Sequence, residues 1–415
     1  MLYPRWLETA RRHADRVAVI DGATGEHLTF AALAARAAAA PPARGPVFAR
    51  SGDLAFLLAI LQAWRDRQPV VPVERGAPAP VLAVPPPPGV VLVKPTPGAT
   101  GVPRGVHFGA AELVAEADRL VAAMDLAPDR PNLGVISLAH SYGFSNLVLP
   151  LLLHGVPLHA LPVPFPQAVA AAFAAHRRLT VPAVPSIWRA WLRSGVLERA
   201  PIATALSAGA PLPLALEHQV HAATGIKIHN FYGASECGGI SLDTSATPRS
   251  DPHDAGTPLP GVRVTTHPDG RLLVESDAVA LGYDQPRPAD LLGGGRFLTH
   301  DLGRVVHDRV LLTGTTGAAI NVAGRKISPA KVEAALAATG LTRRVRVFGT
   351  PSPDPDRVEE IIGMVELKAG ASVANIRQAA AATLAGWELP RHWWTNPPAN
   401  AWALPAAALR ARPLP

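Results

Sequence analysis

The chain has 415 residues, of which 48% are apolar and 17% are charged. This composition excludes a wholly disordered protein and suffices for two or three domains with buried cores. The longest apolar stretches, such as residues 54–61, are far shorter than the roughly 20 residues that a membrane-spanning helix needs. The N-terminus, residues 1–16, carries charges where a signal peptide has an apolar core, so we expect a cytoplasmic protein with no membrane span.

The net charge of +7 would suit a surface that binds nucleic acid. However, only five of the 39 basic residues are lysines, and the arginines are spread along the chain instead of forming blocks with aromatic residues. We therefore expect no nucleic-acid partner and interpret the basic balance as a solvated surface. The single cysteine, Cys237, excludes an internal disulfide and a zinc site built on several thiolates.

Apolar periodicity and proline positions predict an N-terminal part in which helices alternate with short strands. Helices are expected at residues 6–15, 30–40, 52–64 and 110–124. Apolar strands are expected at residues 70–73, 134–139, 157–163 and 226–232. This alternation is typical of an α/β fold.

The texture of the sequence changes from about residue 262. Residues 262–276 read as a β-hairpin with Asp269 and Gly270 at its turn. From about residue 318 the chain has its own pattern of strands and helices, including a helix that Ser328 and Pro329 open as cap and first-turn residues, and a last helix at 373–385. The simplest division is two domains joined near residues 313–317.

The first stretch that could carry chemistry is a loop rich in glycine, threonine and proline, residues 94–106. Glycines let backbone amides approach an anion, and threonine and arginine add donors, so the composition suits phosphate. The loop lacks the Gly-Lys-Ser/Thr ending of the common P-loop. An ordinary turn remains the alternative interpretation.

The second stretch, residues 229–240, directly follows an apolar strand, at the place where α/β sheets bind ligands. Glu236 offers a carboxylate for Mg²⁺, Tyr232 could stack on a base, and Asn230 could bond an exocyclic amine. The sequence around Ser235 misses the hydrolase nucleophile elbow, and a lone cysteine such as Cys237 is usually a buried small residue. In a third stretch, residues 297–303, Asp301 could accept both hydroxyls of a ribose, with a turn or cap role as the alternative.

Taken in order, these stretches resemble the adenylate-forming superfamily of acyl-CoA synthetases, adenylation domains and luciferases. The segments that carry the resemblance are TPGATGVPRGV (96–106), LAHSYGFSNL (138–147), SAGAPLP (207–213), NFYGASE (230–236), THDL (299–302), TGTTG (313–317) and VAGRKISPAKVE (322–333). The resemblance runs over almost the whole chain, although the chain is compact for the family.

The resemblance implies a large N-terminal domain of stacked α/β sheets with a small β-barrel at 1–313, a hinge at 314–317, and a smaller, mobile α+β lid domain at 318–415. It also implies a ligase that uses ATP and Mg²⁺ to convert a carboxylic acid, fatty or aromatic, to an acyl-adenylate. The acyl group then forms a thioester with CoA or with the phosphopantetheinyl group of an acyl carrier protein.

The resemblance also assigns roles to individual residues. The triphosphate loop would contain Thr96, Gly98, Thr100, Gly101 and Arg104, with Thr100 and Arg104 acting in catalysis. The adenine pocket would be lined by Gly209, Ala210, Pro211, Asn230 and Tyr232. Ser235 would contact phosphate, Glu236 would bind the catalytic magnesium, and Asp301 would hold the ribose. The acyl pocket would be bordered by His140, Tyr142 and Gly143, and the thiol tunnel by Gly324.

Several positions depart from the family pattern. In the phosphate loop, Pro97 and Ala99 replace hydroxyl residues. In the segment at 313–317, Thr315 replaces an arginine. The last motif aligns Ala403 with the lysine that would bridge the carboxylate and the α-phosphate in the transition state, and no lysine follows Lys368. The alternative hypothesis is therefore a degenerate homologue that binds a nucleotide or acyl group as a regulatory or scaffold subunit, or that uses only preformed acyl-AMP.

Overall fold

The structure, a computed structural model, describes residues 1–52, 54–82, 84–96, 104–161, 163–316, 319–323, 325–354, 357–404 and 406–411. It divides into two compact units, of which the first contains residues 1–95 and 105–316 and the second contains residues 96–104 and 317–415. The described residues include no helix with the length and apolar character needed to cross a membrane.

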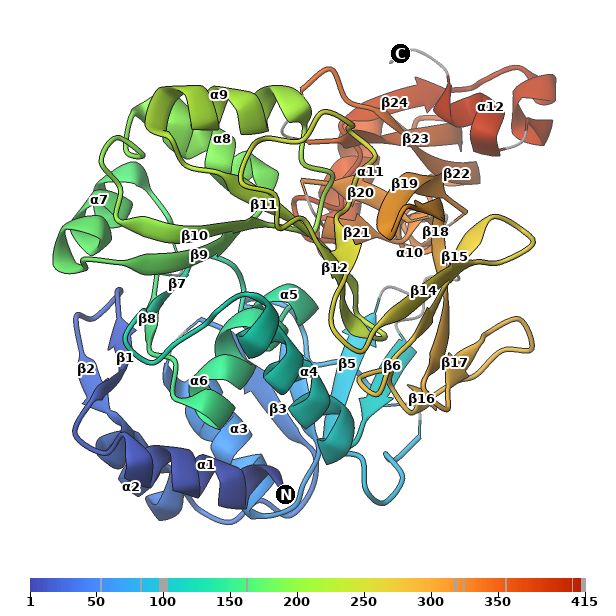
Figure 1. The fold of residues 1–415 in the computed structure, drawn as a ribbon. Coiled ribbons are helices and arrows are strands. Elements are labelled where there is room, and N and C mark those ends of the chain that lie inside the picture. Colours follow the sequence, from blue (N-terminus) through green and yellow to red (C-terminus); the bar gives the residue numbers. More distant parts are fainter. Residues whose placement is uncertain are drawn as a thin grey trace. The chain divides into compact units, whose positions relative to one another are not determined.

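A nine-stranded sheet forms the centre of the first unit (Figure 1). Its strands are β1 (Val17–Asp21), β2 (His27–Thr29), β7 (Asn132–Gly134), β8 (Leu158–Ala160), β9 (Leu179–Ala183), β10 (Ile202–Ser207), β11 (Ile228–Ala234), β12 (Gly238–Leu242) and β13 (Thr257–Pro258). They lie in the order β13-β12-β11-β10-β9-β7-β8-β1-β2. The six inner strands from β11 to β1 pair in parallel, so the ends of β10 and β11 open at the same edge.

A five-stranded sheet in the order β16-β6-β5-β4-β3 carries the segment that leads into the candidate phosphate loop. Its strands are β3 (Val47–Arg50), β4 (Val70–Val73), β5 (Leu92–Thr96), β6 (Arg104–Phe108) and β16 (Gly282–Tyr283). The strand predicted at residues 70–73 is thereby confirmed.

Helices bury their apolar faces on the two sides of the nine-stranded sheet (Figure 1). On one side lie α1 (Leu2–Arg12), α2 (Phe30–Ala39), α4 (Ala110–Ala123), the short α5 (Ser141–Gly143), a π-helical turn (Phe144–Val148) and α6 (Leu149–His154). Helix α3 (Leu54–Arg65) packs on β3 and β4 of the five-stranded sheet. On the other side lie α7 (Pro166–Ala175), α8 (Pro185–Ser194) and α9 (Leu214–Thr224). The helices predicted at 30–40, 52–64 and 110–124 are confirmed. The first begins where the side chain of Thr29 accepts a hydrogen bond from Ala32 N.

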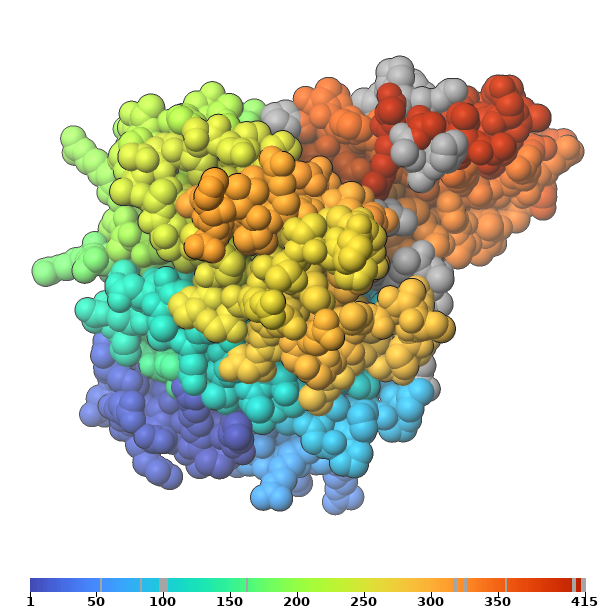
Figure 2. All heavy atoms as spheres, turned by 45° about the vertical axis from the view of Figure 1, so that its right-hand side comes forward, coloured from blue at the N-terminus to red at the C-terminus, as the bar shows by residue number. Residues whose placement is uncertain are grey.

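The third sheet of the first unit is antiparallel and contains β14 (Arg263–Thr266), β15 (Arg271–Glu275), β17 (Leu292–Gly293), β18 (Arg296–Val306) and β19 (Arg309–Thr315). Its residues are among the yellow and orange atoms in Figure 2. The predicted hairpin is confirmed: Gly270 has φ +86° at the turn between β14 and β15, and Asp269 accepts a hydrogen bond from Arg271 N. Closure of these strands into a small barrel stays a prediction.

The second unit is a smaller α+β assembly. Its elements are β20 (Ile320–Val322), β21 (Arg325–Ile327), α10 (Pro329–Ala338), β22 (Thr342–Pro351), β23 (Glu359–Leu367), α11 (Val373–Ala380), β24 (His392–Thr395), a 3-10 helix (Ala399–Ala403) and α12 (Ala406–Arg410). The side chain of Ser328 accepts a hydrogen bond from Lys331 N, so the predicted cap of α10 is confirmed. The hinge at 314–317 and the mobility of this unit stay predictions, and Gly317 lies outside the described residues.

Three element predictions are wrong in extent. Helix α1 spans Leu2–Arg12 instead of 6–15, because Pro4 lies in the first turn, where proline costs no hydrogen bond. The strand expected at 134–139 ends at Gly134, because the chain then turns toward α5. The last helix ends at Ala380 instead of 385, in a turn that continues to Leu384.

Candidate functional site

The ends of β10 and β11 bring the two segments predicted to bind adenine into one place. Ser207 at the end of β10 pairs with Asn230 on β11, and the loop of Gly209, Ala210 and Pro211 follows directly. Gly209 has φ +81°, a left-handed conformation that glycine adopts without a steric cost. Asn230 is half-buried, and its Nδ2 donates a hydrogen bond to Asp254 O at 3.0 Å.

Tyr232 joins β11 to β18. Its hydroxyl donates to Asp301 Oδ2 at 2.8 Å, across 69 positions of sequence. Burial, together with the neighbouring Asp301 carboxylate, raises the pKa of Tyr232 well above its usual value, which keeps the hydroxyl protonated as a donor. Thr299 Oγ1 accepts a hydrogen bond from Asp301 N and fixes the backbone at this position. The residues predicted to contact base and ribose therefore lie side by side.

Glu236 stands in the turn between β11 and β12, where contacts on both sides hold it. Tyr283 on β16 donates its hydroxyl hydrogen to Glu236 Oε1 at 3.0 Å, and Glu236 O accepts from Ala280 N at 2.8 Å. Three residues further on, Gly239 N donates to Glu116 Oε1 at 2.9 Å. Tyr283 thus holds the carboxylate of Glu236, while the backbone of the turn is held by two separate segments, the one at Ala280 and helix α4.

The donor set around Glu236 fits magnesium bound together with a substrate phosphate. Mg²⁺ is usually held in proteins by one or two carboxylates plus phosphate oxygens and waters. Among the described residues no group of three or more histidine, cysteine, aspartate or glutamate side chains could enclose a metal ion. The Glu236 carboxylate fits the protein's share of such a donor set.

A buried lysine lies close to this turn. Lys94 on β5 is only 4% exposed, and its Nζ lies 4.5 Å from the ring centroid of Phe108 and 6.0 Å from that of Phe144. Burial lowers the pKa of Lys94, while the negative charge of Glu116 opposes this shift. Burial also raises the pKa of Glu116. Lys94 thus belongs to the strand that enters the phosphate loop, and Glu116 contacts the turn that carries Glu236.

The segment of residues 138–147 packs against the β11 end. Ser141 Oγ donates to Ser235 Oγ at 2.8 Å, and the rings of Tyr142 and Phe231 are 6.0 Å apart between centroids. A Cβ on Gly143 would lie 2.0 Å from Ser137 O, so only glycine fits there. His140 is exposed at the start of α5, and burial raises the pKa of Tyr142. The residues predicted to border an acyl pocket therefore adjoin the residue predicted to contact phosphate.

The phosphate loop itself is described only at its two ends. Thr96 and Arg104 are both buried, and Thr96 Oγ1 donates to Arg104 O at 3.1 Å. Gly98, Thr100 and Gly101, with the departures Pro97 and Ala99, lie outside the described residues, as does Gly324. On β19, Thr315 pairs with Asp301 and donates through Oγ1 to His300 O at 3.0 Å.

In the second unit, the position aligned with the missing lysine ends the 3-10 helix. The side chain of Ala403 is exposed, and its neighbours Trp402 and Leu404 accept hydrogen bonds through their carbonyl oxygens from Arg346 Nη1, at 3.0 and 2.7 Å. The guanidinium of Arg344 stacks 4.3 Å from the ring centroid of Trp402. Arg344 and Arg346 therefore contact the residues on either side of this position.

Sequence reasoning assigned no role to Lys94, although this residue opens the first candidate stretch, and it missed Glu116 and Tyr283 as neighbours of the site. A charged residue inside the apolar run of β5 is a usable signal for Lys94. Glu116 lies on the same face of α4 as the buried Leu113 and Leu120, which is also unusual for a carboxylate. Tyr283 carries no local signal, because its role arises only where β16 meets the turn after β11.

Comparison with known proteins places these features in a family context. Residues 57–283, more than half of the chain, match the family model described as AMP-binding enzyme. A long-chain-fatty-acid–CoA ligase of Bacillus subtilis is 25% identical over 73% of this chain and 57% of its own length. A probable 2-succinylbenzoate–CoA ligase of Mycobacterium tuberculosis is 30% identical over 63% of this chain and 67% of its own length. The chain thus spans little more than half the length of the first of these relatives.

Solved structures show the same fold over nearly the whole chain. A double mutant of o-succinylbenzoate CoA synthetase from Bacillus subtilis has a TM-score of 0.83 at 17% identity, with 99% of this chain and 98% of that chain covered. The amide bond synthetase McbA from Marinactinospora thermotolerans has a TM-score of 0.81 at 21% identity, with 98% and 99% covered. The expected fold class, a mixed α/β architecture with several sheets, is confirmed.

Proposed function

The chain belongs to the AMP-binding enzyme family, and from this membership we propose that it is an acid–thiol ligase that activates a carboxylic acid with MgATP. The acid becomes an acyl-adenylate, and the acyl group then passes to a thiol. The named relatives are ligases that join long-chain fatty acids or 2-succinylbenzoate to CoA. For this chain we propose a fatty or aromatic acid, CoA or an acyl carrier protein as acceptor, and a cytoplasmic location.

The observation that best supports this proposal is the hydrogen bond from Tyr232 to Asp301. It joins the two segments that the family resemblance assigns to adenine and to ribose. Asp301 accepts this bond through one oxygen, and a carboxylate has further acceptor sites for ribose hydroxyls. Beside them, Asn230 and the Gly209–Pro211 loop, which come from adjacent strand ends, would form a wall of the adenine site.

In the first half-reaction, a carboxylate oxygen of the acid attacks the α-phosphorus of ATP, and pyrophosphate leaves with the electrons of the broken P–O bond. Thr100 and Arg104 would hold the leaving phosphates, and Ser235 would add a hydroxyl donor. Magnesium, when bound, neutralises charge on the phosphate oxygens. Glu236 would hold that ion, with its carboxylate kept in place by Tyr283 and by the Glu116 contact to the same turn.

In the second half-reaction, the sulfur of the acceptor thiol attacks the acyl carbonyl, and AMP leaves. His140, Tyr142 and Gly143 would border the acyl group. The Ser141–Ser235 hydrogen bond supports this arrangement, because it joins the segment to the residue proposed to contact phosphate.

Ala403 raises the question of how much the first half-reaction is slowed. Loss of a positioned group that stabilises transition-state charge typically costs about 2.7–4 kcal/mol, or a factor of about 10² to 10³ in rate. We therefore propose slow adenylation. The alternative, a regulatory or scaffold subunit, gains no support from the relatives, which are named as ligases.

The proposal is tested by acid-dependent hydroxamate formation with MgATP over a panel of fatty and aromatic acids. We expect weak turnover that Ala403→Lys increases and that Glu236→Gln removes. Synthetic acyl-AMP supplied with CoA or a carrier protein isolates the second half-reaction. A protein that is silent with acids, also as Ala403→Lys, but active with acyl-AMP would use only the preformed adenylate. Silence in both assays would contradict the proposed activity.

A further inference from the structure

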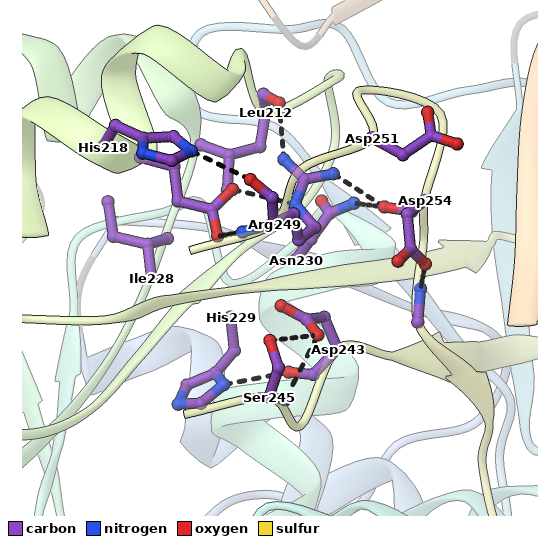
Figure 3. A network of polar contacts seen from close by, with 12 residues as sticks. Leu212, His218, Ile228, His229, Asn230, Asp243, Ser245, Arg249, Asp251 and Asp254 are labelled. Carbon is purple, nitrogen blue, oxygen red and sulfur yellow. Dashed lines mark hydrogen bonds and ion pairs between the residues drawn. The ribbon is translucent and has the colours of Figure 1, made fainter. Parts of the chain in front are cut away.

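A single backbone carbonyl connects Asn230 to a buried arginine. Asp254 O accepts one hydrogen bond from Asn230 Nδ2 at 3.0 Å and a second from Arg249 Nη1 at 2.6 Å (Figure 3). A carbonyl oxygen has two lone pairs, so these two donors fill its capacity. The orientation of the Asn230 amide therefore depends on where Asp254 O is held.

Arg249 is itself fixed on every side. It is 4% exposed, its Nε donates to Glu217 Oε2 at 2.8 Å, and its backbone N donates to Glu217 Oε1 at 3.0 Å. Its Nη2 donates to Leu212 O at 2.7 Å, directly after the Gly209–Pro211 loop. Glu217 on α9 is completely buried. One guanidinium thus connects both walls of the candidate adenine pocket, the loop after β10 and the amide on β11 (Figure 3).

The chemistry of the amide follows from this arrangement. Because Nδ2 of Asn230 is committed to Asp254 O, the side chain offers a ligand its Oδ1, which makes no hydrogen bond with a described residue. An amide oxygen accepts from the exocyclic amine of adenine and repels the O6 carbonyl of hypoxanthine or guanine. A reversed amide would present a donor and would have the opposite preference.

We propose that Arg249, held by Glu217, is a positioning residue that fixes the Asn230 amide through Asp254 O and so makes the site select adenine over 6-oxopurines. This inference rests on the proposed function, since it assumes that Asn230 faces the base. The side chain of Asp254 is held separately, because its Oδ2 accepts from Arg309 Nε at 2.6 Å. Arg249 can thus be altered without removing the other support of the 254 segment.

The experiment is a calorimetric titration of the full chain with MgATP and with MgITP, which differ at the purine 6-position. The first variant, Arg249→Lys, keeps the charge but loses the two guanidinium nitrogens that reach Asp254 O and Leu212 O. The second variant, Glu217→Gln, has an amide in place of the carboxylate, so only one of its two terminal atoms can accept a hydrogen bond. Arg130→Lys is the matched control, because Arg130 is also buried but pairs with Asp125, outside this network.

The wild-type chain is expected to bind ATP at least about tenfold more tightly than ITP, since a site built around a hydrogen bond rejects the mismatched partner. In Arg249→Lys the ratio is expected to fall to about threefold or less, with a smaller fall in Glu217→Gln and none in Arg130→Lys. If Arg249 had only a structural role, its substitution would weaken the binding of ATP and of ITP equally.

The outcomes separate this inference from the proposed function. Equal binding of ATP and ITP by the wild-type chain overturns the inference, as does a ratio that stays unchanged in both Arg249→Lys and Glu217→Gln. If Arg249→Lys does not fold, Glu217→Gln and the wild-type ratio still decide. If the wild-type chain binds neither nucleotide, the proposed function itself fails. If ATP binds but the ratio of ATP affinity to ITP affinity does not change in the variants, the proposed function stands and this inference does not.

Discussion

Gly238 is a residue at which substitution should damage the site directly. It has φ +69°, and a Cβ placed on it would lie 2.2 Å from Glu116 Cδ. The left-handed backbone costs an alanine about 1–2 kcal/mol. Displacing the buried Glu116 carboxylate adds about 1–3 kcal/mol of overpacking. Gly238→Ala should therefore lower the free energy of unfolding by about 2–5 kcal/mol.

Gly225 provides the matched control, because it has φ +72° with no atom within 4 Å of the added Cβ. Gly225→Ala should cost only the backbone contribution of about 1–2 kcal/mol. Urea denaturation of both variants measures the difference, and MgATP titration reports the accompanying displacement of Glu236. Glu116→Ala combined with Gly238→Ala relieves the collision, so the two substitutions should be less than additive by about 1–3 kcal/mol.

Two results would refute this reasoning. One is an equal loss of stability in Gly238→Ala and Gly225→Ala, which would show that the Glu116 carboxylate does not press on the turn. The other is strict additivity of the Glu116 and Gly238 substitutions, which would show that the two residues do not contact each other in solution.

The remaining predictions concern buried charge. Lys227→Met should lower the free energy of unfolding, measured by urea denaturation, by about 3–5 kcal/mol. The reason is that Lys227 Nζ bonds the fully buried carboxylates of Glu217 (2.5 Å) and Asp243 (2.7 Å). A loss below about 1 kcal/mol would contradict this prediction. Burial, with the neighbouring His176, lowers the pKa of His159 to about 4 from its ordinary 6.5. Between pH 4 and pH 6.5 this histidine is protonated in the unfolded chain and neutral in the folded chain. The free energy of unfolding should therefore fall as the pH drops from 6.5 to 4, by up to about 3 kcal/mol. His159→Gln should remove this share of the pH dependence, and an unchanged slope would contradict the prediction.

Local signals in the sequence predicted the elements that depend on few residues. The Asp269-Gly270 turn and the Ser328 cap each specify a conformation within four positions of the chain, and both are present. The strand expected at 134–139 failed because its apolar residues serve a turn toward α5, where Gly143 approaches Ser137 O. Apolar character alone does not distinguish these two uses.

The residues of the candidate site fall into the same two groups, those that a sequence signal predicts and those that it does not. Motif order led to Asn230, Tyr232 and Asp301, and the Tyr232–Asp301 hydrogen bond brings two of these segments together. The supporting contacts had no such signal. Glu116 meets Gly239 across 123 positions, and Arg249 meets Glu217 across 32, so only the packed fold shows them as partners. A carboxylate inside an apolar helix face indicates that a partner exists, but it does not say which residue that partner is.

The central claim, that this chain forms acyl-adenylates, is tested most directly by carboxylic-acid-dependent exchange of labelled pyrophosphate into ATP. The account predicts slow exchange with at least one fatty or aromatic acid, faster exchange in Ala403→Lys, and none in Glu236→Gln. Absence of exchange across the panel in both the wild-type chain and Ala403→Lys would contradict it, as would exchange that Glu236→Gln leaves unchanged.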